Sequence, residues 1–170
     1  MELRDHQKIA VVGSPGSGKS WLATRLARIT GYPLFHLDKE FWQPGWVMPP
    51  REQRATMQQA MISGPEWIID GNYGHLMAPR FAAADLVIFL DINRVTCVLS
   101  ALRRAGTKRD DLPDFLQEPA LFSRDTWQFI KWIWDYPKNG RPNVLALHSA
   151  HPEVDFWRIR TRRAAQHLVS

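Results

Sequence analysis

Cysteine is almost absent from this sequence: Cys97 is the single one among 170 residues. An internal disulfide is therefore impossible, and the apolar stretch around Cys97 indicates a buried thiol without a catalytic role. The sequence also lacks any apolar run approaching the roughly 20 residues that cross a bilayer. Its opening stretch, MELRDHQK, mixes acids and bases where a signal peptide would be apolar. These absences point away from secreted and membrane-spanning classes, and we expect a cytoplasmic protein.

Acidic residues are outnumbered: Lys and Arg total 22 and Asp and Glu total 17, which gives a net charge of +5. A basic chain suits an anionic partner such as a nucleotide, a phosphate or a nucleic acid. The sequence has no helix-turn-helix, zinc-finger or single-strand-binding signature, so a nucleic-acid partner is not favoured. The bases cluster at Arg103, Arg104, Lys108 and Arg109 and again at Arg158, Arg160, Arg162 and Arg163. We interpret the second cluster as the solvated face of a helix.

Runs of strand length alternate along the chain with segments of helical periodicity. The length and the ordinary hydrophobic content of 45% suit one folded domain spanning residues 1–170. We expect strands at Lys8 to Val12, Pro33 to Asp38, Glu66 to Asp70 and Asp85 to Asp91, and a fifth strand from Asn143. We expect helices at Ser20 to Ile29, Glu52 to Ile62 and Arg94 to Arg104, and from Arg124 and Glu153. This alternation predicts a three-layer α/β/α fold around a five-stranded parallel sheet.

The carboxyl ends of the predicted strands are where such a sheet binds its ligands. Three acids, Asp38, Asp70 and Asp91, fall at these ends. The polar segment before the aromatic helix is too long for an ordinary connection, and we predict a mobile lid at approximately residues 105–119. An acceptor-side segment is expected at approximately residues 38–64.

A glycine-rich motif follows the first predicted strand: Gly13, Gly18, Lys19 and Ser20 fit G-x-x-x-x-G-K-[ST] without a mismatch. The glycines let backbone N–H groups point inward around a phosphate, and the helix that follows adds the positive end of its dipole. The Lys19 ammonium suits the β and γ phosphates, and the Ser20 hydroxyl suits Mg²⁺. The residues predicted to bind ATP are Gly13, Ser14, Pro15, Gly16, Ser17, Gly18, Lys19, Ser20 and Trp21.

Phosphoryl transfer depends on positioning and on neutralised charge, so arginines are expected beside the phosphate loop. The candidates are Arg80, Arg103, Arg104 and Arg109. Arg103 and Arg104 end the helix before the predicted lid, from where one of them would reach the triphosphate when the lid closes. Arg80 would approach from the third strand.

Several segments resemble known families. No N-K-x-D motif of GTPases is present, and the wider arrangement resembles the nucleotide kinase-like P-loop fold of adenylate, shikimate and gluconate kinases. FHLDKEFWQPGW and WIIDGNY resemble, more closely, bacterial DNA topology modulation proteins, which look like relatives of adenylate kinases. The resemblance to adenylate kinases implies that Asp70 holds magnesium through water. In shikimate kinase-like enzymes an acid ends the second strand, and Asp38 matches that position.

The acceptor site is predicted around Asp38. A hydroxyl acceptor benefits from a carboxylate that takes or orients its proton, whereas a phosphate acceptor needs no base. Phe41, Trp42, Trp46 and Tyr73 would form a flat apolar wall against a base or a sugar. The predicted acceptor set is completed by Asp70, Gly71, Asn72 and Arg80. Most of the residues Trp127, Trp132 and Trp134, in contrast, are expected to pack in the core.

The predicted function is therefore transfer of the γ-phosphate of ATP to a small acceptor, a nucleoside or nucleotide in the first place, by a monomer or weak homodimer. One alternative is a kinase of a small hydroxylated metabolite, which Asp38 favours. Another is a nucleotide-switched nucleic-acid-binding protein that affects DNA topology. A loop that binds ATP and transfers nothing is disfavoured by the intact Lys19 and Ser20.

Overall fold

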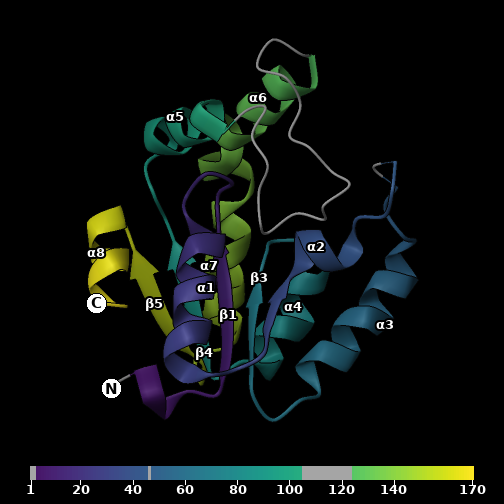
Figure 1. The fold of residues 1–170 in the computed structure, drawn as a ribbon, viewed down its shortest axis with the longest axis vertical. Coiled ribbons are helices and arrows are strands. Elements are labelled where there is room, and N and C mark those ends of the chain that lie inside the picture. Colours follow the sequence, from purple (N-terminus) through teal and green to yellow (C-terminus); the bar gives the residue numbers. More distant parts are fainter. Residues whose placement is uncertain (1–2, 46, 105–123) are drawn as a thin grey trace.

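The computed structural model describes residues 3–45, 47–104 and 124–170, and one parallel β-sheet forms its centre (Figure 1). The strands are β1 (Lys8–Gly13), β2 (Leu34–His36), β3 (Trp67–Asp70), β4 (Leu86–Leu90) and β5 (Asp155–Ile159). Their order is β2-β3-β1-β4-β5, and each neighbouring pair is parallel. The α/β fold with a five-stranded parallel sheet is thereby confirmed.

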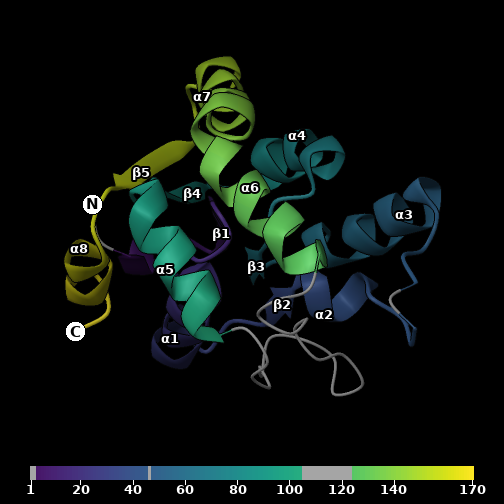
Figure 2. The same cartoon turned by 90° about the horizontal axis from the view of Figure 1, so that it is seen from above.

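Helices cover both faces of this sheet, which gives three layers (Figure 2). Their bounds are η1 (Leu3–Asp5), α1 (Lys19–Thr30), α2 (Leu37–Phe41), α3 (Arg51–Ile62), α4 (Gly74–Ala83), α5 (Arg94–Arg104), α6 (Arg124–Asn139), α7 (Arg141–Ala150) and α8 (Arg162–His167). One face of the sheet packs against α1, α5 and α8 through a core that includes Leu22 and Cys97. The other face packs against α4 and α7 through a core that includes Phe81 and Val144. Helix α6 contributes side chains to both cores.

The three central strands are mostly apolar, and the helices on both faces of the sheet bury them almost completely. Every residue of β3 and β4 and all of β1 after Lys8 are buried. The edge strands β2 and β5 are only partly covered. Because all five strands point the same way, the segments that follow β1, β2 and β3 meet at one edge of the sheet.

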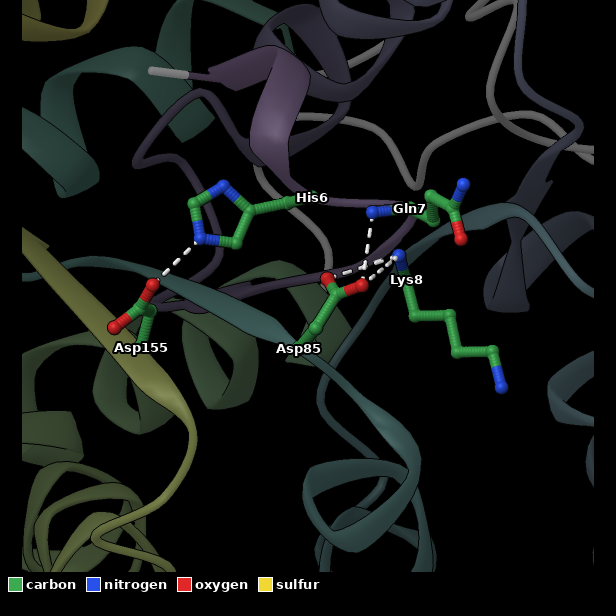
Figure 3. A network of polar contacts seen from close by, with 5 residues as sticks. All are labelled: His6, Gln7, Lys8, Asp85 and Asp155. Atoms are coloured by element: carbon green, nitrogen blue, oxygen red, sulfur yellow. Dashed lines mark hydrogen bonds and ion pairs between the residues drawn. The ribbon is translucent and has the colours of Figure 1, made fainter. Parts of the chain in front are cut away.

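Polar contacts fasten the amino ends of the strands together at the opposite edge of the sheet (Figure 3). The Asp85 carboxylate, just before β4, accepts hydrogen bonds from the backbone N–H groups of Gln7 at 2.8 Å and Lys8 at 2.9 Å. His6 Nε2 lies 2.6 Å from Oδ2 of Asp155, the first residue of β5. These contacts join β1 to β4 and β5, and they leave the carboxyl ends of the strands available for a site.

The prediction for the C-terminal elements is wrong. The segment from Asn143, expected as a strand, lies in α7, and the segment from Glu153, expected as a helix, contains β5. Pro142 occupies the first turn of α7, where proline favours a helix start. Strand β5 pairs with β4 over its whole length but is an edge strand. Because an edge strand is partly exposed, it can contain the charged residues Asp155 and Arg158. These residues interrupt the continuous apolar sequence by which buried strands are recognised.

The prediction that the tryptophans of α6 pack in the core is also wrong. Trp127, Trp132 and Trp134 are 60%, 48% and 45% exposed. The core instead receives Ile133 and Tyr136 from this helix, with exposed fractions of 0% and 5%. A helix needs only one apolar stripe to pack, so an aromatic-rich sequence leaves the remaining rings at the surface.

Three predictions lie outside the described residues: the lid at about 105–119, Arg109 and Trp46. Within the described ranges, no helix is both long and apolar enough to span a membrane. Cys97 is buried, as expected from its apolar neighbours.

Candidate active site

The phosphate loop runs from the end of β1 into the first turn of α1. Ser17 N–H donates to the Ser14 carbonyl at 3.1 Å, and the Lys19 ammonium donates to the same carbonyl at 3.2 Å. Helix α1 begins after Gly18, which has no side chain to cap its first N–H groups. These N–H groups and the Lys19 ammonium together form a cationic cradle with the chemistry that phosphate requires.

Contacts with distant elements hold this loop in place. Gly16 has a φ of +79°, and a Cβ at this position would lie 2.3 Å from the Cys97 carbonyl oxygen in α5. Only glycine permits this close approach. From the opposite end of the chain, Arg162 Nη2 donates to the Gly16 carbonyl at 2.8 Å. The predicted solvated face of the last helix therefore includes an arginine that contacts the phosphate loop.

Asn72 joins the phosphate loop to the segment after β3. Its Oδ1 accepts from Gly13 N–H at 3.1 Å and its Nδ2 donates to the Gly13 carbonyl at 2.8 Å. Gly71 N–H donates to the Val11 carbonyl at 3.2 Å. In this structure the Asn72 side chain is engaged with the loop backbone, so it positions the loop from the neighbouring strand.

The residues expected at the magnesium site fit a hydrated cation. Asp70 is 5% exposed at the end of β3; its Oδ2 lies 2.9 Å from His36 Nδ1, while Oδ1 has no hydrogen-bond partner among the described residues. A buried carboxylate oxygen of this kind fits a water ligand of Mg²⁺. Ser20 lies half-buried in the first turn of α1. No cluster of three or more His, Cys, Asp or Glu side chains suited to a metal is present in the described ranges.

Arg80 is not exposed to solvent: its exposed fraction is 0%. Its Nη2 donates to the carbonyls of Gly71 and Asn72 at 2.7 Å each, and its Nη1 donates to Gln58 Oε1 at 3.1 Å. Burial lowers the pKa of Arg80 to about 10. The guanidinium therefore holds the backbone after β3 from within the core, and this structure does not direct it toward the triphosphate as predicted.

Asp38 lies in the first turn of α2, two residues after the end of β2, rather than at the end of the strand itself. Its Oδ1 accepts a 2.7 Å hydrogen bond from the Tyr73 hydroxyl. Burial, and then the charge of Asp38, raises the pKa of Tyr73 well above its ordinary value, so the phenol keeps its proton and acts as a donor. Because Tyr73 follows Asn72, these contacts connect the carboxylate to the phosphate loop through two adjacent residues.

Tyr73 itself has an uncommon backbone conformation. Its φ is 45°, and it is the only residue other than glycine with a positive φ in the described ranges. The left-handed conformation is unfavourable for a bulky side chain and recurs at functional sites. Here it stands at the start of α4, directly after the Gly71 and Asn72 backbone that Arg80 holds.

The predicted aromatic wall is only partly present. Phe41 is fully buried, because Leu37 and Phe41 stand four residues apart on the inner face of α2. The Phe41 ring packs edge-on against Tyr73, with centroids 5.0 Å apart, so it supports Tyr73 and has no surface for a ligand. Trp42 is partly exposed. Phe41 is thus a core residue, and its ring does not provide the predicted stacking surface.

Sequence reasoning missed a cation beside Tyr73, the residue whose hydroxyl donates to Asp38. The Arg54 guanidinium, on α3, lies 6.0 Å from the Tyr73 ring centroid, and its Nε donates to the Pro49 carbonyl at 3.0 Å. Burial lowers the pKa of His75, and the charges of Arg54 and Arg51 lower it further. Arg51 is exposed and Arg54 is partly buried on a polar helix, and nothing in their spacing distinguishes them from ordinary surface residues.

The remaining predicted residues lie at the surface around the loop. Arg103 is exposed and Arg104 partly buried in the last turn of α5. Trp21 is 43% exposed in the first turn of α1, with the Arg25 guanidinium 5.7 Å from its ring centroid. The structure does not bring Trp21 into the cradle formed by the Gly13–Ser20 backbone.

No protein-family model and no curated protein matches the chain. Solved structures do match it. The shikimate kinase of Bacteroides thetaiotaomicron superposes with a TM-score of 0.61 at 16% identity and covers 96% of this chain and 94% of its own. The shikimate kinase of Acinetobacter baumannii, solved in complex with shikimate, gives a TM-score of 0.63 at 16% identity and covers 98% and 93%.

These comparisons concern the fold. The chain shares the α/β architecture of these shikimate kinase structures over nearly its whole length. The finer resemblance to bacterial DNA topology modulation proteins stays a prediction. The chain is thus similar in fold to two solved shikimate kinases.

Proposed function

We propose that this chain is an ATP-dependent kinase that transfers the γ-phosphate to a hydroxyl group of a small acceptor. The complete Gly13–Ser20 loop and the similarity to shikimate kinases support the use of ATP. Ser20 and Asp70 would hold Mg²⁺, directly and through water. When bound, the ion neutralises the charge that develops on the transferred phosphate.

The Asp38 carboxylate is the observation that carries this proposal. It lies at the same edge of the sheet as the phosphate loop, and the Tyr73 hydroxyl fixes one of its oxygens at 2.7 Å. A carboxylate held in this way can accept the proton of an acceptor hydroxyl as that oxygen attacks phosphorus. Asp38 is therefore proposed as the residue that orients and deprotonates the acceptor.

A phosphate acceptor fits this arrangement less well. It needs no base, and the negative charge of Asp38 would repel it. The stacking surface expected for a nucleoside is also reduced, because Phe41 is buried in the core. A hydroxylated metabolite, the alternative that Asp38 favoured, is therefore preferred to the nucleoside or nucleotide considered first.

The cations on α3 suggest that the acceptor is itself an anion. Arg54 lies against Tyr73, the residue that holds Asp38, and Arg51 lies one turn earlier on the same helix. A guanidinium binds a carboxylate in a bidentate geometry. Shikimate, the ligand of the Acinetobacter enzyme, is a small hydroxylated acid of this kind. We include Arg54 in the proposed acceptor site on these grounds.

The remaining arginines take different proposed roles. Arg104, at the end of α5, and Arg109 are proposed to neutralise the triphosphate, with Arg103 as a further candidate. Arg80 is proposed as a positioning residue, because its guanidinium contacts the backbone of Gly71 and Asn72 from within the core.

The test is ADP release from ATP and Mg²⁺ with a panel of small hydroxy acids, polyols, nucleosides and nucleoside monophosphates. We expect turnover with a hydroxyl compound and an approximately 100-fold loss of kcat in Asp38→Asn. The matched control is Glu40→Gln, which removes an exposed carboxyl from the same helix and should leave the rate unchanged. Turnover with a monophosphate that survives Asp38→Asn, or ATP binding without turnover on any acceptor, would refute the proposal.

A further inference from the structure

Four arginines surround a cavity at the carboxyl ends of β4 and β5, apart from the phosphate loop. The cavity measures about 490 Å³. Its walls come from the loop after β4, the start of α5, the junction of α6 with α7, and the end of β5. The polar residues among them are Asp91, Asn93, Arg94, Arg141, Arg158 and Arg160.

The cavity has a strong excess of positive charge. Four guanidinium groups face one carboxylate, Asp91, which leaves a net charge of three. Arg158 donates to Asp91 Oδ2 through Nε at 2.9 Å and Nη2 at 2.5 Å, and Arg141 Nη1 lies 3.8 Å from Oδ1. Asp91 therefore forms ion pairs with two of the four guanidinium groups. Arg160 forms no ion pair within the described ranges, so its charge is uncompensated.

A third guanidinium group of the cavity, that of Arg94, is also held in place. The Arg94 guanidinium stacks on Trp134 at 4.0 Å from the ring centroid. Arg94 begins α5, an eleven-residue helix, and Asn93 Oδ1 accepts from the Val95 N–H in its first turn. The positive end of this helix thus adds to the charge of the arginines. Cationic groups that are fixed before a ligand arrives lose little entropy when it binds.

We propose that this cavity binds the phosphate group of a second small molecule. Guanidinium groups match phosphate oxygens in charge and in bidentate geometry. The volume of the cavity lies within the roughly 300–1,000 Å³ range of small-molecule sites. It is larger than the volume that a phosphate ion alone would fill. The chemical class is therefore a phosphorylated small molecule, with the phosphate among the arginines and the remainder in the cavity.

This site is distinct from the phosphate loop but adjacent to it along α5. Cys97, three residues after Arg94, is where Gly16 approaches α5, and Arg162, two residues after Arg160, donates to Gly16. The two anion sites therefore share α5 and the segment that leaves β5. Both elements lie on the side of the molecule away from α3, where the proposed acceptor site is (Figure 2).

The experiment measures phosphate binding on the complete chain by isothermal titration calorimetry. Adenylyl imidodiphosphate with Mg²⁺, a non-hydrolysable ATP analogue, is first added to saturation so that the phosphate loop is occupied. Inorganic phosphate is then titrated, and in a second arm a phosphate monoester is compared with the corresponding alcohol. We expect one inorganic phosphate per nucleotide-loaded chain, tighter binding of the monoester, and no binding of the alcohol.

Arg160→Met tests the assignment, because it removes an exposed guanidinium of the cavity and keeps an unbranched side chain. We expect phosphate affinity to fall about tenfold. The matched control is Arg163→Met, an exposed arginine of α8 outside the cavity, which changes the net charge equally and should alter the affinity less than twofold. Equal losses in the two variants would mean diffuse attraction by the basic surface and would overturn the proposal.

Two further outcomes would also overturn it. If the ATP analogue abolishes phosphate uptake, the anion occupied the phosphate loop. If phosphate binds but the monoester is excluded, the cavity is not a site for phosphorylated molecules. An independent readout is the ¹⁹F spectrum of the chain labelled with fluorotryptophan, in which phosphate should shift the Trp134 resonance, assigned with Trp134→Phe, because Arg94 stacks on that ring.

Discussion

The phosphate side of the candidate site and its acceptor side are built from different kinds of contact. The phosphate side is mostly one segment, Gly13–Ser20, in which Ser17 and Lys19 both donate to the Ser14 carbonyl. The acceptor side joins Asp38 to Tyr73 across 35 positions of sequence. The geometry of a local motif is determined by the spacing of its own residues. The geometry of two residues that are far apart in the sequence depends instead on how their helices and strands pack. The following substitutions should affect the phosphate side and the acceptor side of the site differently.

Lys19→Ala should have the largest effect. It removes the ammonium from the phosphate loop, and we expect kcat for phosphoryl transfer to fall about 100- to 1,000-fold. The free energy of unfolding should change little, because the side chain is partly exposed. The measurement is ADP release with the acceptor identified by the panel. Lys39→Ala, an exposed lysine on α2, is the control, and a similar loss there would contradict a local role for Lys19.

Gly16→Ala should strongly destabilise the fold at the loop. The added Cβ would lie 2.3 Å from the Cys97 carbonyl oxygen, and the alanine would have to adopt the left-handed backbone conformation. Together these two effects should lower the free energy of unfolding by about 3 kcal/mol. Gly31→Ala is a matched control with the same φ of +79° and no atom within 4 Å of the added Cβ, so only about 1 kcal/mol should be lost. Urea unfolding of both variants measures the difference. Equal losses would show that the contact with α5 does not constrain the loop.

Tyr73→Phe tests the acceptor side. It removes the hydroxyl that donates to Asp38 and keeps the ring that packs against Phe41. We expect kcat to fall about tenfold, because a hydrogen bond to a charged group is lost, with the KM for ATP unchanged. Tyr32→Phe, on the α1 side of the sheet, is the control. A change confined to the KM for ATP would assign Tyr73 to the phosphate side instead.

His75 should give the smallest effect, which appears in the pH dependence of stability. Burial, and then Arg54 and Arg51, lowers the pKa of His75 below 6.5 in the folded chain. The unfolded chain therefore binds a proton more readily, so the free energy of unfolding should decrease as pH falls below about 6.5. His75→Gln should flatten this decrease in urea titrations between pH 7.5 and about 5. An unchanged slope would show that the cations of α3 do not act on this side chain.

The sequence predicted the parts of the molecule whose signals are local. Continuous apolar runs identified β1, β3 and β4, and the glycine spacing identified the phosphate loop. Strand β5 was missed because an edge strand accepts Asp155 and Arg158. The Asp38–Tyr73 hydrogen bond, the burial of Arg80 and the position of Arg54 each depend on how α2, α3 and α4 pack. The spacing of residues along the chain does not indicate how these helices pack against one another.

The central claim is that Asp38 serves a hydroxyl acceptor at the edge of the sheet where the phosphate loop holds ATP. The most direct measurement is ³¹P NMR of the products formed from ATP, Mg²⁺ and the acceptor that gives turnover. The account predicts a new phosphomonoester resonance with carbon-bound proton coupling, formed at the rate of ADP release and lost in Asp38→Asn. A new phosphoanhydride doublet, persisting in Asp38→Asn, would contradict it and identify a phosphate as the acceptor.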